Sequence, residues 1–506
     1  MFTKITSATI SGIDGVDVSV EIDVARGIPA IDIVGLPEMS VKESRDRVRA
    51  AIRNAGFEFP VKRITINLAP ANLKKEGSGF DLPIAIGIMA AAGYVACDNL
   101  SDCAFLAELS LEGRLRGVNG MLPMALALAD AGIKRIFVAP ENAHEVAITG
   151  KVTPVAAETL SDVVAYLRGE KQPVPVEKLE TEVNETAELL DFADVQGQFQ
   201  GKRALEIAAA GGHNVIMTGP PGTGKTMLAR RITTILPPLT DAESLSVTKI
   251  YSVAGLLKNH GSLLRERPFR APHHTASDAA LIGGGRVPRP GEVTLSHNGV
   301  LFLDEFPEFA KNVIEVLRQP LEDGDVTISR VNATMTYPAQ FMLVAAMNPC
   351  ACGYRNDGKI ACRCTDADIK KYERRISGPL LDRIDIAVEV PRLDYEDFVA
   401  DKTSETSVQI RRRVISARAL QTERFKNYGI ACNALMGHNH IKLLCKMSKN
   451  ATELLKQAYE SMRLSARAYD RIIKTARTIA DLENEAMINE THIAEAIQLR
   501  PKKYIE

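Results

Sequence analysis

The chain has 506 residues, and its 62 Lys and Arg against 63 Asp and Glu give a formal net charge of −1. This length allows two to four domains, each with a core of its own. Although 45% of the residues are hydrophobic, no apolar run reaches the roughly 18–20 residues of a membrane helix, which excludes a spanning segment of that kind. The start, MFTKITSATISGIDG, lacks the layout of a signal peptide, so we expect a cytoplasmic protein.

Residues 1–170 mix strand and helix patterns. Apolar and polar residues alternate in VDVSVEIDVARGIPAIDIVG and in RITINLAP, as is typical of strands, whereas LPIAIGIMAAAG favours an apolar helix. Ser40 and Glu43 form S-x-x-E, a capping box that predicts a helix running to about Asn54. The sequence therefore predicts an α/β domain over residues 1–170.

A break follows at KQPVPVEKLETEVNETAELL, residues 171–190, where alternate prolines give way to acidic residues, as suits an extended connector. Strand-like NVIMTG, VLFLDE and FMLVAAMNP then alternate with helical stretches over residues 191–391, as a parallel sheet requires. Residues 392–506 have mainly helical patterns. The predicted fold class is α/β throughout the first two domains, with a helical C-terminal domain.

A nucleotide-binding motif, GPPGTGKT, lies between the strand NVIMT and the helical stretch MLARRITTIL. It matches G-x-x-x-x-G-K-S/T, in which backbone N–H groups at a helix N-terminus cradle phosphates. Lys225 is expected to reach the β- and γ-phosphates, and the Thr226 hydroxyl to ligate Mg²⁺. The candidate ATP-binding residues are Gly219, Pro220, Pro221, Gly222, Thr223, Gly224, Lys225 and Thr226.

Two further strand ends complete the predicted ATP site. GVLFLDE ends in Asp304, a candidate Mg²⁺ ligand, and Glu305, which would polarise the attacking water. FMLVAAM ends at Asn348, where an amide can orient the water or sense the γ-phosphate, although a turn-forming Asn before Pro349 is also consistent with the sequence. The sequence therefore predicts an ATP hydrolase.

Four cysteines follow Asn348 in the pattern C-x-C-x9-C-x-C. Two close pairs that fold back on each other could supply the four thiolates of a tetrahedral Zn²⁺ site, although C-x-C is tighter than the usual C-x2-C spacing. Structural zinc is the favoured interpretation, free thiols are the second, and a reducing cytosol disfavours a redox pair. The candidate zinc ligands are Cys350, Cys352, Cys362 and Cys364.

The region from 401 to 477 is basic, with sixteen Lys and Arg against six Asp and Glu, a local balance of +10. A basic domain in a neutral chain suggests a polyanionic partner. A solvated helical face would give the same composition, so both interpretations stay open.

DFADVQGQ, the GPPGTGKT loop, the acidic pair and Asn348 together resemble AAA+ ATPases. RPFRAPHHTASDAALIGGG, GEVTLSHNGVLFLDE, SGPLLDRIDI and LSARAYDRIIKTARTIADL are similar to the magnesium-chelatase-like ComM/YifB family of bacteria. The resemblance spans almost the whole chain. It implies a homo-hexameric ring with ATP held between subunits, a helical lid formed by residues 392–506, and branched or single-stranded DNA as a partner.

The resemblance also assigns two arginines. Arg383, in LLDRID, matches the arginine finger that reaches a neighbour's γ-phosphate, although an ion pair with Asp382 or Asp385 is the simpler local interpretation. Arg467 matches the second sensor arginine of the lid, and the sequence leaves open whether it acts on its own nucleotide or a neighbour's.

This branch of AAA+ proteins carries a helix-2 insert, expected within about residues 255–297, and a hairpin before the first sensor. DVTISRVNATMTYPAQF reads as such a hairpin, with two alternating strands around a short turn. Both elements line the ring's pore in the family, which makes Arg286, Arg289 and Arg330 candidate DNA contacts. For His273 and His274, packing or a structural role near the nucleotide is favoured over metal binding.

The N-terminal domain resembles the Lon-protease-type domain of the ribosomal S5 domain 2-like fold, but it lacks the Ser–Lys dyad. Phe80 lies near the expected serine with Ser78 offset, and Met121 and Leu122 occupy the region of the lysine, so we expect no protease activity. The family resemblance implies a DNA motor that drives branch migration as incoming single-stranded DNA is integrated in natural transformation. The alternative is a protein-remodelling or metal-chelatase motor with the same ATP site.

Overall fold

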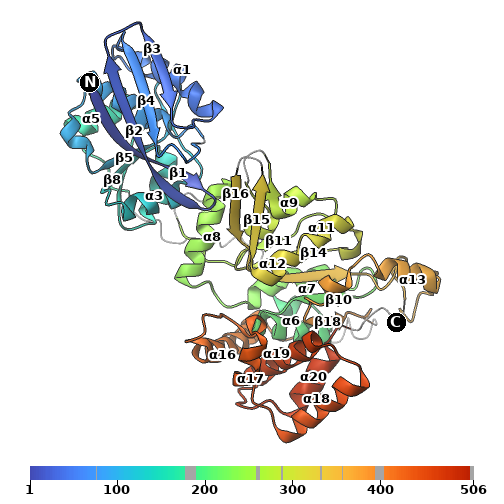
Figure 1. Cartoon of the computed structure of the whole chain (residues 1–506). Helices are drawn as coiled ribbons and strands as arrows, with labels where there is room; N and C mark the ends of the chain where they lie inside the picture. Colours follow the sequence, from blue (N-terminus) through green and yellow to red (C-terminus); the bar gives the residue numbers. More distant parts are fainter. Residues whose placement is uncertain are drawn as a thin grey trace. The chain divides into compact units, whose positions relative to one another are not determined.

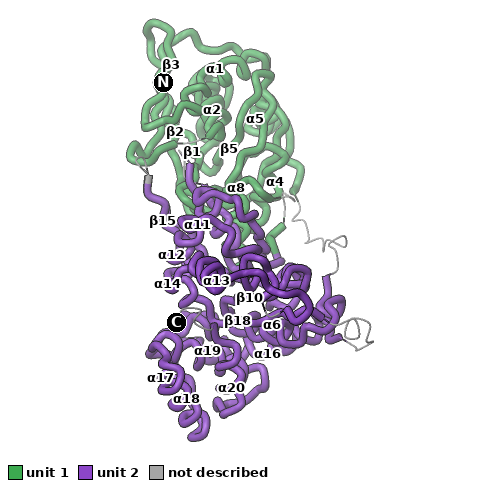
Figure 2. The backbone as a smooth tube through the Cα atoms, turned by 90° about the vertical axis from the view of Figure 1, so that its right-hand side faces the viewer, with its two compact units in different colours: residues 1–184, 241–264 green, residues 185–240, 265–506 purple. Residues whose placement is uncertain are grey.

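The computed structural model describes residues 1–75, 77–176, 190–257, 262–285, 289–330, 333–355, 357–393 and 404–501. The chain forms two compact units (Figure 2). Unit 1 contains Met1–Asn184 and Asp241–Leu264, and unit 2 contains Glu185–Thr240 and Arg265–Glu506. Most of the predicted connector, residues 177–189, lies outside the described residues.

Unit 1 is built on a seven-stranded mixed sheet in the order β3-β4-β2-β1-β5-β8-β9 (Figure 1). Its strands are β1 (Phe2–Ser11), β2 (Asp14–Ala25), β3 (Ala30–Val34), β4 (Arg63–Ala69), β5 (Cys103–Leu106), β8 (Arg135–Val138) and β9 (Thr153–Ala156), with a separate pair β6 (Glu108–Leu109) and β7 (Leu115–Arg116). Its helices are α1 (Met39–Asn54), α2 (Asp81–Ala91), α3 (Met121–Asp130), α4 (Pro140–Ala147), α5 (Leu160–Arg168) and α8 (Asp241–Ala254). The predicted strands and apolar helix are therefore confirmed.

The predicted capping box at the start of α1 is wrong, although the helix does end at Asn54. The helix begins at Met39, and the extended residue Glu38 is its N-cap without a side-chain hydrogen bond. Ser40 therefore lies inside the first turn, where its hydroxyl does not cap the helix. Helix α2 is buried on all sides, as expected for a helix with no polar face.

Helix α8 follows the nucleotide-binding segment in the sequence but belongs to unit 1. It packs against α3, and the backbone N–H of Gly120 donates to the carbonyl oxygen of Ser252 over 2.9 Å. The buried Glu145 carboxylate accepts hydrogen bonds from the Ser252 hydroxyl and, over 2.8 Å, from the Leu122 N–H. Unit 1 thus includes a second segment, Asp241–Leu264, which follows the nucleotide-binding loop in the sequence.

Unit 2 contains a five-stranded parallel sheet in the order β11-β14-β17-β10-β18. The strands are β10 (Val215–Thr218), β11 (Phe269–Arg270), β14 (Val300–Leu303), β17 (Met342–Met347) and β18 (Ile386–Glu389). The associated helices are α6 (Phe199–Gly211), α7 (Lys225–Ile235), α9 (Asp278–Ile282), α10 (Glu292–Leu295), α11 (Lys311–Glu315), α12 (Arg318–Asp323), α13 (Asp366–Glu373) and α14 (Gly378–Leu381). Strands β14 and β17 are buried along their whole length, as a parallel sheet covered on both faces requires.

Two strand pairs accompany this sheet. The predicted hairpin is confirmed as β15 (Asp325–Arg330) and β16 (Ala333–Pro338), which pair antiparallel, and its turn lies outside the described residues. A second antiparallel pair joins β12 (Gly283–Gly284) to β13 (Arg289–Pro290). The two pairs are in contact, since a Cβ on Gly283 would stand 2.9 Å from Cδ1 of Ile328.

The last part of unit 2 is helical, as predicted. It contains α16 (Ser407–Phe425), α17 (His438–Leu444), α18 (Lys449–Ser461), α19 (Ala466–Leu482) and α20 (Glu490–Gln498). The apolar face of α19 packs against α16, α20 and α6, so these helices share one core with the sheet. No helix within the described ranges is long and apolar enough to cross a membrane.

Candidate nucleotide site

The nucleotide-binding loop connects β10 to α7, which begins at Lys225. Its first residue must be glycine, because a Cβ on Gly219 would stand 2.1 Å from the carbonyl oxygen of Val390. The Lys225 ammonium is buried and donates to the carbonyl oxygens of Gly219 over 2.7 Å and Pro220 over 2.8 Å. Burial lowers the pKa of Lys225, so its charge stands in a poorly solvated loop where an anionic ligand stabilises it.

Two oxygen ligands suitable for Mg²⁺ meet beside this loop. The Thr226 hydroxyl donates to Oδ2 of Asp304 over 2.7 Å. Asp304 follows β14, which is linked through β17 to β10, and parallel strands place their carboxyl ends at one edge. Because Mg²⁺ prefers a few hydroxyl and carboxylate oxygens together with phosphate and water, this pair fits the metal.

Glu305 stands next to this pair in an unusual backbone conformation. Its φ of 50° lies in the left-handed region, and its N–H donates to Oδ1 of Asp304 over 2.9 Å. Non-glycine residues in this region are rare and cluster at functional sites. The half-exposed carboxylate of Glu305 lies 3.0 Å from Nδ1 of His274. An accessible carboxylate is therefore held beside Thr226 and Asp304.

Asn348 lies at the end of β17, with its Oδ1 3.5 Å from Nζ of Lys225. The backbone of Asn348 forms a hydrogen bond to the Tyr372 hydroxyl. Burial raises the pKa of Tyr372 to about 12, so the phenol stays protonated at neutral pH. The structure thus brings Lys225, Thr226, Asp304, Glu305 and Asn348 together at one edge of the sheet.

The four cysteines of the C-x-C-x9-C-x-C segment also converge. Their Sγ atoms all lie within 4.8 Å of one another, with 3.4 Å between Cys350 and Cys352, 3.7 Å between Cys350 and Cys362, and 3.5 Å between Cys352 and Cys362. A tetrahedron with metal–sulfur distances of about 2.3 Å has edges of about 3.8 Å, so the thiols fit a Zn²⁺ ion. Hydrogen bonds from the backbone N–H groups of Arg363 and Tyr354 lower the pKa of Cys352 to about 6, which favours a thiolate.

None of the eight cysteines is in a disulfide. The loop that carries the cysteines contacts the nucleotide-binding loop, since a Cβ on Gly353 would lie 2.9 Å from Cδ of Pro221 and 3.9 Å from Cγ of Asn348. The cysteine loop and the predicted sensor residue are therefore neighbours in space as well as in sequence.

Arg383 lies at the opposite edge of the sheet. Strand β18 pairs in parallel with β10, with Val215 opposite Ile386, so Arg383 precedes the strand at the end remote from the nucleotide-binding loop. A four-residue strand spans about 13 Å. The guanidinium of Arg383 donates to the carbonyl oxygen of Pro379 over 2.6 Å and pairs with Glu322. The structure therefore does not bring Arg383 to the chain's own nucleotide-binding loop.

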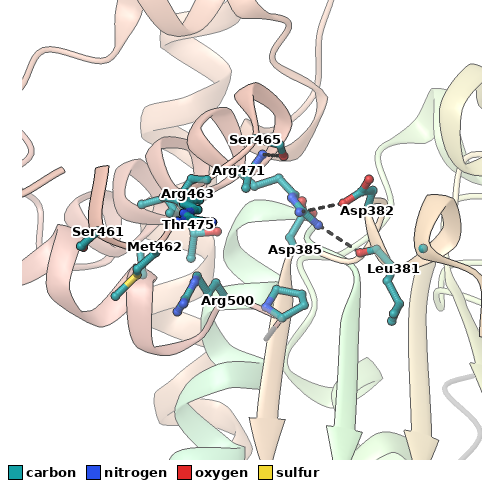
Figure 3. A pocket seen from close by; sticks show the side chains of 16 residues that line it. Leu381, Asp382, Asp385, Ser461, Met462, Arg463, Ser465, Arg471, Thr475 and Arg500 are labelled. Carbon is teal, nitrogen blue, oxygen red and sulfur yellow. Dashed lines mark hydrogen bonds and ion pairs between the residues drawn. The ribbon is translucent and has the colours of Figure 1, made fainter. Parts of the chain in front are cut away.

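Arg467 lies in the first turn of α19, exposed, and it forms no hydrogen bond or ion pair with the part of the chain that the structure describes. One turn later, Arg471 donates to the carbonyl oxygen of Leu381 over 3.0 Å (Figure 3). It also donates to the carbonyl oxygen of Ile384 over 2.6 Å. The start of α19 is thereby fixed beside the segment that carries Arg383. Both predicted arginines thus lie near the edge of the sheet opposite the nucleotide-binding loop.

A cavity of about 630 Å³ opens between this segment and the start of α19 (Figure 3). Arg463, Arg471 and Arg500 line it together with Asp382 and Asp385. The Asp385 carboxylate is largely buried and 3.3 Å from Nδ1 of His213, and although burial opposes ionisation, the histidine and nearby cations lower its pKa. The cavity wall is therefore charged, and its two carboxylates are paired with Arg471 and His213.

The candidate DNA contacts belong to the two strand pairs. Arg289 begins β13 and is exposed, and Arg330 ends β15. Arg286 lies outside the described residues. The basic region at residues 401–477 has fewer positive side chains available to a partner than its composition indicates, because many of its arginines bind acceptors inside unit 2. These arginines are Arg413, Arg418, Arg424, Arg471 and Arg477.

Comparisons with known proteins agree with this geometry. Residues 191–398 match the family model described as magnesium chelatase, subunit ChlI, residues 20–142 match subunit ChlI of Mg-chelatase, and residues 404–500 match the C-terminal part of ChlI. Competence protein ComM of Haemophilus influenzae is 46% identical over 97% of this chain and 95% of its own length. The chain belongs to the magnesium-chelatase-like ComM/YifB family. The uncharacterized YifB proteins of Salmonella typhimurium and Escherichia coli are 43% and 42% identical, each over 97% of this chain and 95% of their own length.

Membership of the ComM/YifB family places the chain among AAA+ proteins and implies ATPase activity. The sequence did not indicate the contacts of two side chains of the site. Gln198 is buried, and its amide donates to the carbonyl oxygens of Thr223 over 3.2 Å and Pro391 over 2.8 Å, so it braces the nucleotide-binding loop. The sequence signal for Gln198 was its position at the end of DFADVQGQ. For His274 the sequence favoured packing or a structural role near the nucleotide, but nothing in RAPHHTAS indicates its contact with Glu305.

Proposed function

We propose that this chain is an ATP-driven motor that assembles as a homo-hexamer and acts on branched DNA as a branch-migration helicase. The biological setting would be the integration of incoming single-stranded DNA during natural transformation, as the name of its relative, competence protein ComM, suggests. The observation that carries the proposal is the separation of the ATP-binding residues and the two arginines onto opposite edges of one parallel sheet.

At the first edge, each side chain has a role that fits its contacts. Lys225 would bind the β- and γ-phosphates, and Thr226 and Asp304 would hold the Mg²⁺ ion that neutralises phosphate charge. Glu305 would accept the proton of the attacking water, and Asn348 would orient that water. Gln198 would keep the loop in shape through its two backbone contacts.

The arginines at the opposite edge support the assembly of several copies of the chain. Arg383 and Arg467 cannot reach the chain's own loop across the length of the sheet, but a second copy could present them to it. We therefore propose that both arginines act on a neighbour's nucleotide, where a planar guanidinium stabilises charge on the transferring phosphoryl group. A closed ring gives every site the same pair of arginines.

The DNA part of the proposal rests on the two contacting strand pairs, in which Arg289 begins β13 and Arg330 ends β15. Together with Arg286 they would contact phosphates, so binding should depend on salt and not on base sequence. Unit 1 would serve as a non-catalytic, Lon-like module. Where that fold would place a catalytic Ser–Lys dyad, Phe80, Met121 and Leu122 are buried in the hydrophobic core.

We further propose that Cys350, Cys352, Cys362 and Cys364 bind a structural Zn²⁺ ion. Their mutual distances fit a tetrahedral site, and the ion would fix the loop that contacts Pro221 and Asn348. Elemental analysis of the purified protein should find about one zinc per chain, and Cys362→Ser should lose it. Intact thiols without stoichiometric zinc would reject this part.

A second candidate is a protein-remodelling or metal-chelatase motor, which the family models named for the ChlI subunit favour. ATPase rates and binding with four-way-junction, single-stranded and linear DNA separate the two. The DNA motor predicts salt-sensitive binding and faster ATP turnover with junctions, whereas no binding at low salt would reject it. Glu305→Gln should retain ATP-dependent assembly and lose turnover, and normal hydrolysis by this variant would remove Glu305 from its assigned role.

A further inference from the structure

Helix α13 ends beside the residues that would carry out ATP hydrolysis. It begins directly after the cysteine segment, where Thr365 and Asp368 form a capping box. Tyr372 and Glu373 are buried side chains of its last turn, and Arg375 follows two residues after the helix ends. These last three side chains have contacts that reach beyond α13.

Tyr372 connects the helix to Asn348. Only 5% of its surface is exposed, and its hydroxyl forms a hydrogen bond with the backbone of Asn348. The side chain of Asn348 in turn lies 3.5 Å from Nζ of Lys225. Because a side-chain amide moves with its own backbone, the Tyr372 hydroxyl fixes the place at which the Asn348 amide would meet a water molecule.

Arg375 connects the same end of α13 to the segment that follows Glu305. Its Nη1 donates to Oε2 of Glu308 over 2.6 Å and to the carbonyl oxygen of Pro307 over 3.3 Å. Both acceptors belong to the short helix η3 (Phe306–Glu308), which begins directly after Glu305. Within this turn the Glu308 N–H donates to the carbonyl oxygen of Glu305 over 2.7 Å. Arg375 therefore holds the turn on which the left-handed backbone of Glu305 depends.

The two connections act on neighbouring elements, since η3 packs against β17, the strand that Asn348 follows. A cavity of about 380 Å³ lies between the end of α13 and the segment after Glu305, so polar contacts must fix the distance that packing leaves open. Cζ of Arg375 also lies 5.7 Å from the centroid of the Tyr372 ring, within the range of a cation–π contact. We call Tyr372 and Arg375 the α13 bracket.

The cysteine loop holds the α13 bracket from its other side. The buried carboxylate of Glu373 lies 2.8 Å from Nη1 of Arg355, which stands between the two cysteine pairs. This loop also approaches the nucleotide-binding loop through Gly353 and Pro221. The end of α13 is therefore fixed by the loop that already adjoins the ATP site.

We propose that Tyr372 and Arg375 are positioning residues for ATP hydrolysis, and that they hold the Asn348 amide and the Glu305 carboxylate in place relative to each other. The inference rests on the proposed function, which gives Glu305 and Asn348 their roles. A misplacement of about 1 Å at a reacting group can cost about 100-fold in rate, so indirect contacts of this kind matter.

The α13 bracket should act on the hydrolysis step and not on ATP binding. Across the described part of the chain, neither of its side chains has a hydrogen bond or ion pair with Lys225, Thr226 or Asp304. The groups that would hold phosphate and Mg²⁺ therefore keep their contacts when the bracket is altered.

The test measures steady-state ATP turnover and ATP affinity for full-length chains with Tyr372→Phe or Arg375→Gln. Tyr94→Phe is the matched control for the first, because its hydroxyl also accepts a backbone N–H, over 3.1 Å, in unit 1. Arg135→Gln is the control for the second, because it removes a half-exposed ion pair of 2.8 Å with Asp102. Native mass and thermal melting check that each variant assembles and folds.

We expect Tyr372→Phe and Arg375→Gln each to lower kcat about threefold to tenfold, the effect of one hydrogen bond, with the Kd for ATP unchanged. Arg375→Lys keeps the positive charge near Glu308 and should recover most of the lost rate. Both control variants should stay near the wild-type kcat.

An Asn348→Ala background separates positioning from a general loss of structure. This background lacks the amide that Tyr372 positions, so adding Tyr372→Phe should change kcat by less than about twofold. Arg375→Gln acts through Glu305 and should keep its full effect there. A merely structural role of Tyr372 would lower kcat by the same factor in both backgrounds.

A wild-type kcat in folded Tyr372→Phe and Arg375→Gln variants overturns the inference, as does a raised Kd for ATP that accounts for the loss of turnover. A full effect of Tyr372→Phe in the Asn348→Ala background removes Tyr372 from its assigned role. If the wild type does not hydrolyse ATP, or if Glu305→Gln hydrolyses it normally, the proposed function fails instead.

Discussion

Replacing Gly353 with alanine should weaken ATP binding from outside the nucleotide-binding loop. Gly353 has φ +86°, a conformation that costs a non-glycine residue about 1–2 kcal/mol. An added Cβ would also stand 2.9 Å from Cδ of Pro221, so either the cysteine loop or the nucleotide-binding loop must move. If about 1.4 kcal/mol of this cost appears in binding, the Kd for ATP rises about tenfold. Titration with a fluorescent ATP analogue measures the change.

Gly358→Ala is a matched control in the same loop. Gly358 has φ +77°, but nothing lies within 4 Å of an added Cβ. Gly358→Ala therefore introduces the same unfavourable backbone conformation without a steric contact to the nucleotide-binding loop. Both variants should lose about 1–2 kcal/mol of unfolding free energy, and only Gly353→Ala should bind ATP more weakly. Equal Kd values in the two variants would refute the contact between the loops.

Three other outcomes follow from buried or paired groups. Asp481→Ala should lower the free energy of unfolding by about 3–5 kcal/mol in urea titrations, because it leaves Arg424 and Arg477 without their buried carboxylate. Burial raises the pKa of Cys103 to about 12 from its ordinary 9.0. The contribution of this thiol to the free energy of unfolding is therefore fully present below pH 9 and falls as pH rises toward 12, because the unfolded chain loses the thiol proton first. Iodoacetamide at pH 9 should therefore label Cys103 slowly in the folded chain, and rapid labelling would contradict its burial. Arg383→Ala should lower kcat by roughly 10³-fold in the assembly while ATP affinity holds, and an unchanged kcat would remove Arg383 from the site.

The parts of the site that local sequence patterns define were predictable. A glycine-rich loop between a strand and a helix, and apolar strands ending in Asp304 and Asn348, specify both the sheet and its functional edge. The hairpin at residues 325–338 could be predicted because alternation extends on both sides of a short turn. The helix ending at Asn54 shows the limit, since its end was predicted correctly while the predicted capping box at Ser40 was wrong.

Contacts between distant segments could not be predicted. The composition of residues 401–477 gives no sign that Arg413 and Arg424 are engaged by Glu206 and Asp481, because net charge does not identify partners. His274 and Glu305 are 31 positions apart, and only the adjacency of β11 and β14 brings them together. Helix α8 reads as an ordinary helix of the ATPase region, and its place in unit 1 depends on packing against α3.

The position of α8 has a consequence for biosynthesis. A ribosome delivers the N-terminal part of a chain first, and domains generally fold as units. Unit 1, however, includes residues 241–264, so translation must pass through the whole nucleotide-binding loop before all of this first unit has been made. A nascent chain halted at residue 184 would lack Ser252 as a partner for the buried Glu145. The buried Glu145 can therefore gain its Ser252 partner only after the nucleotide-binding loop has been synthesised.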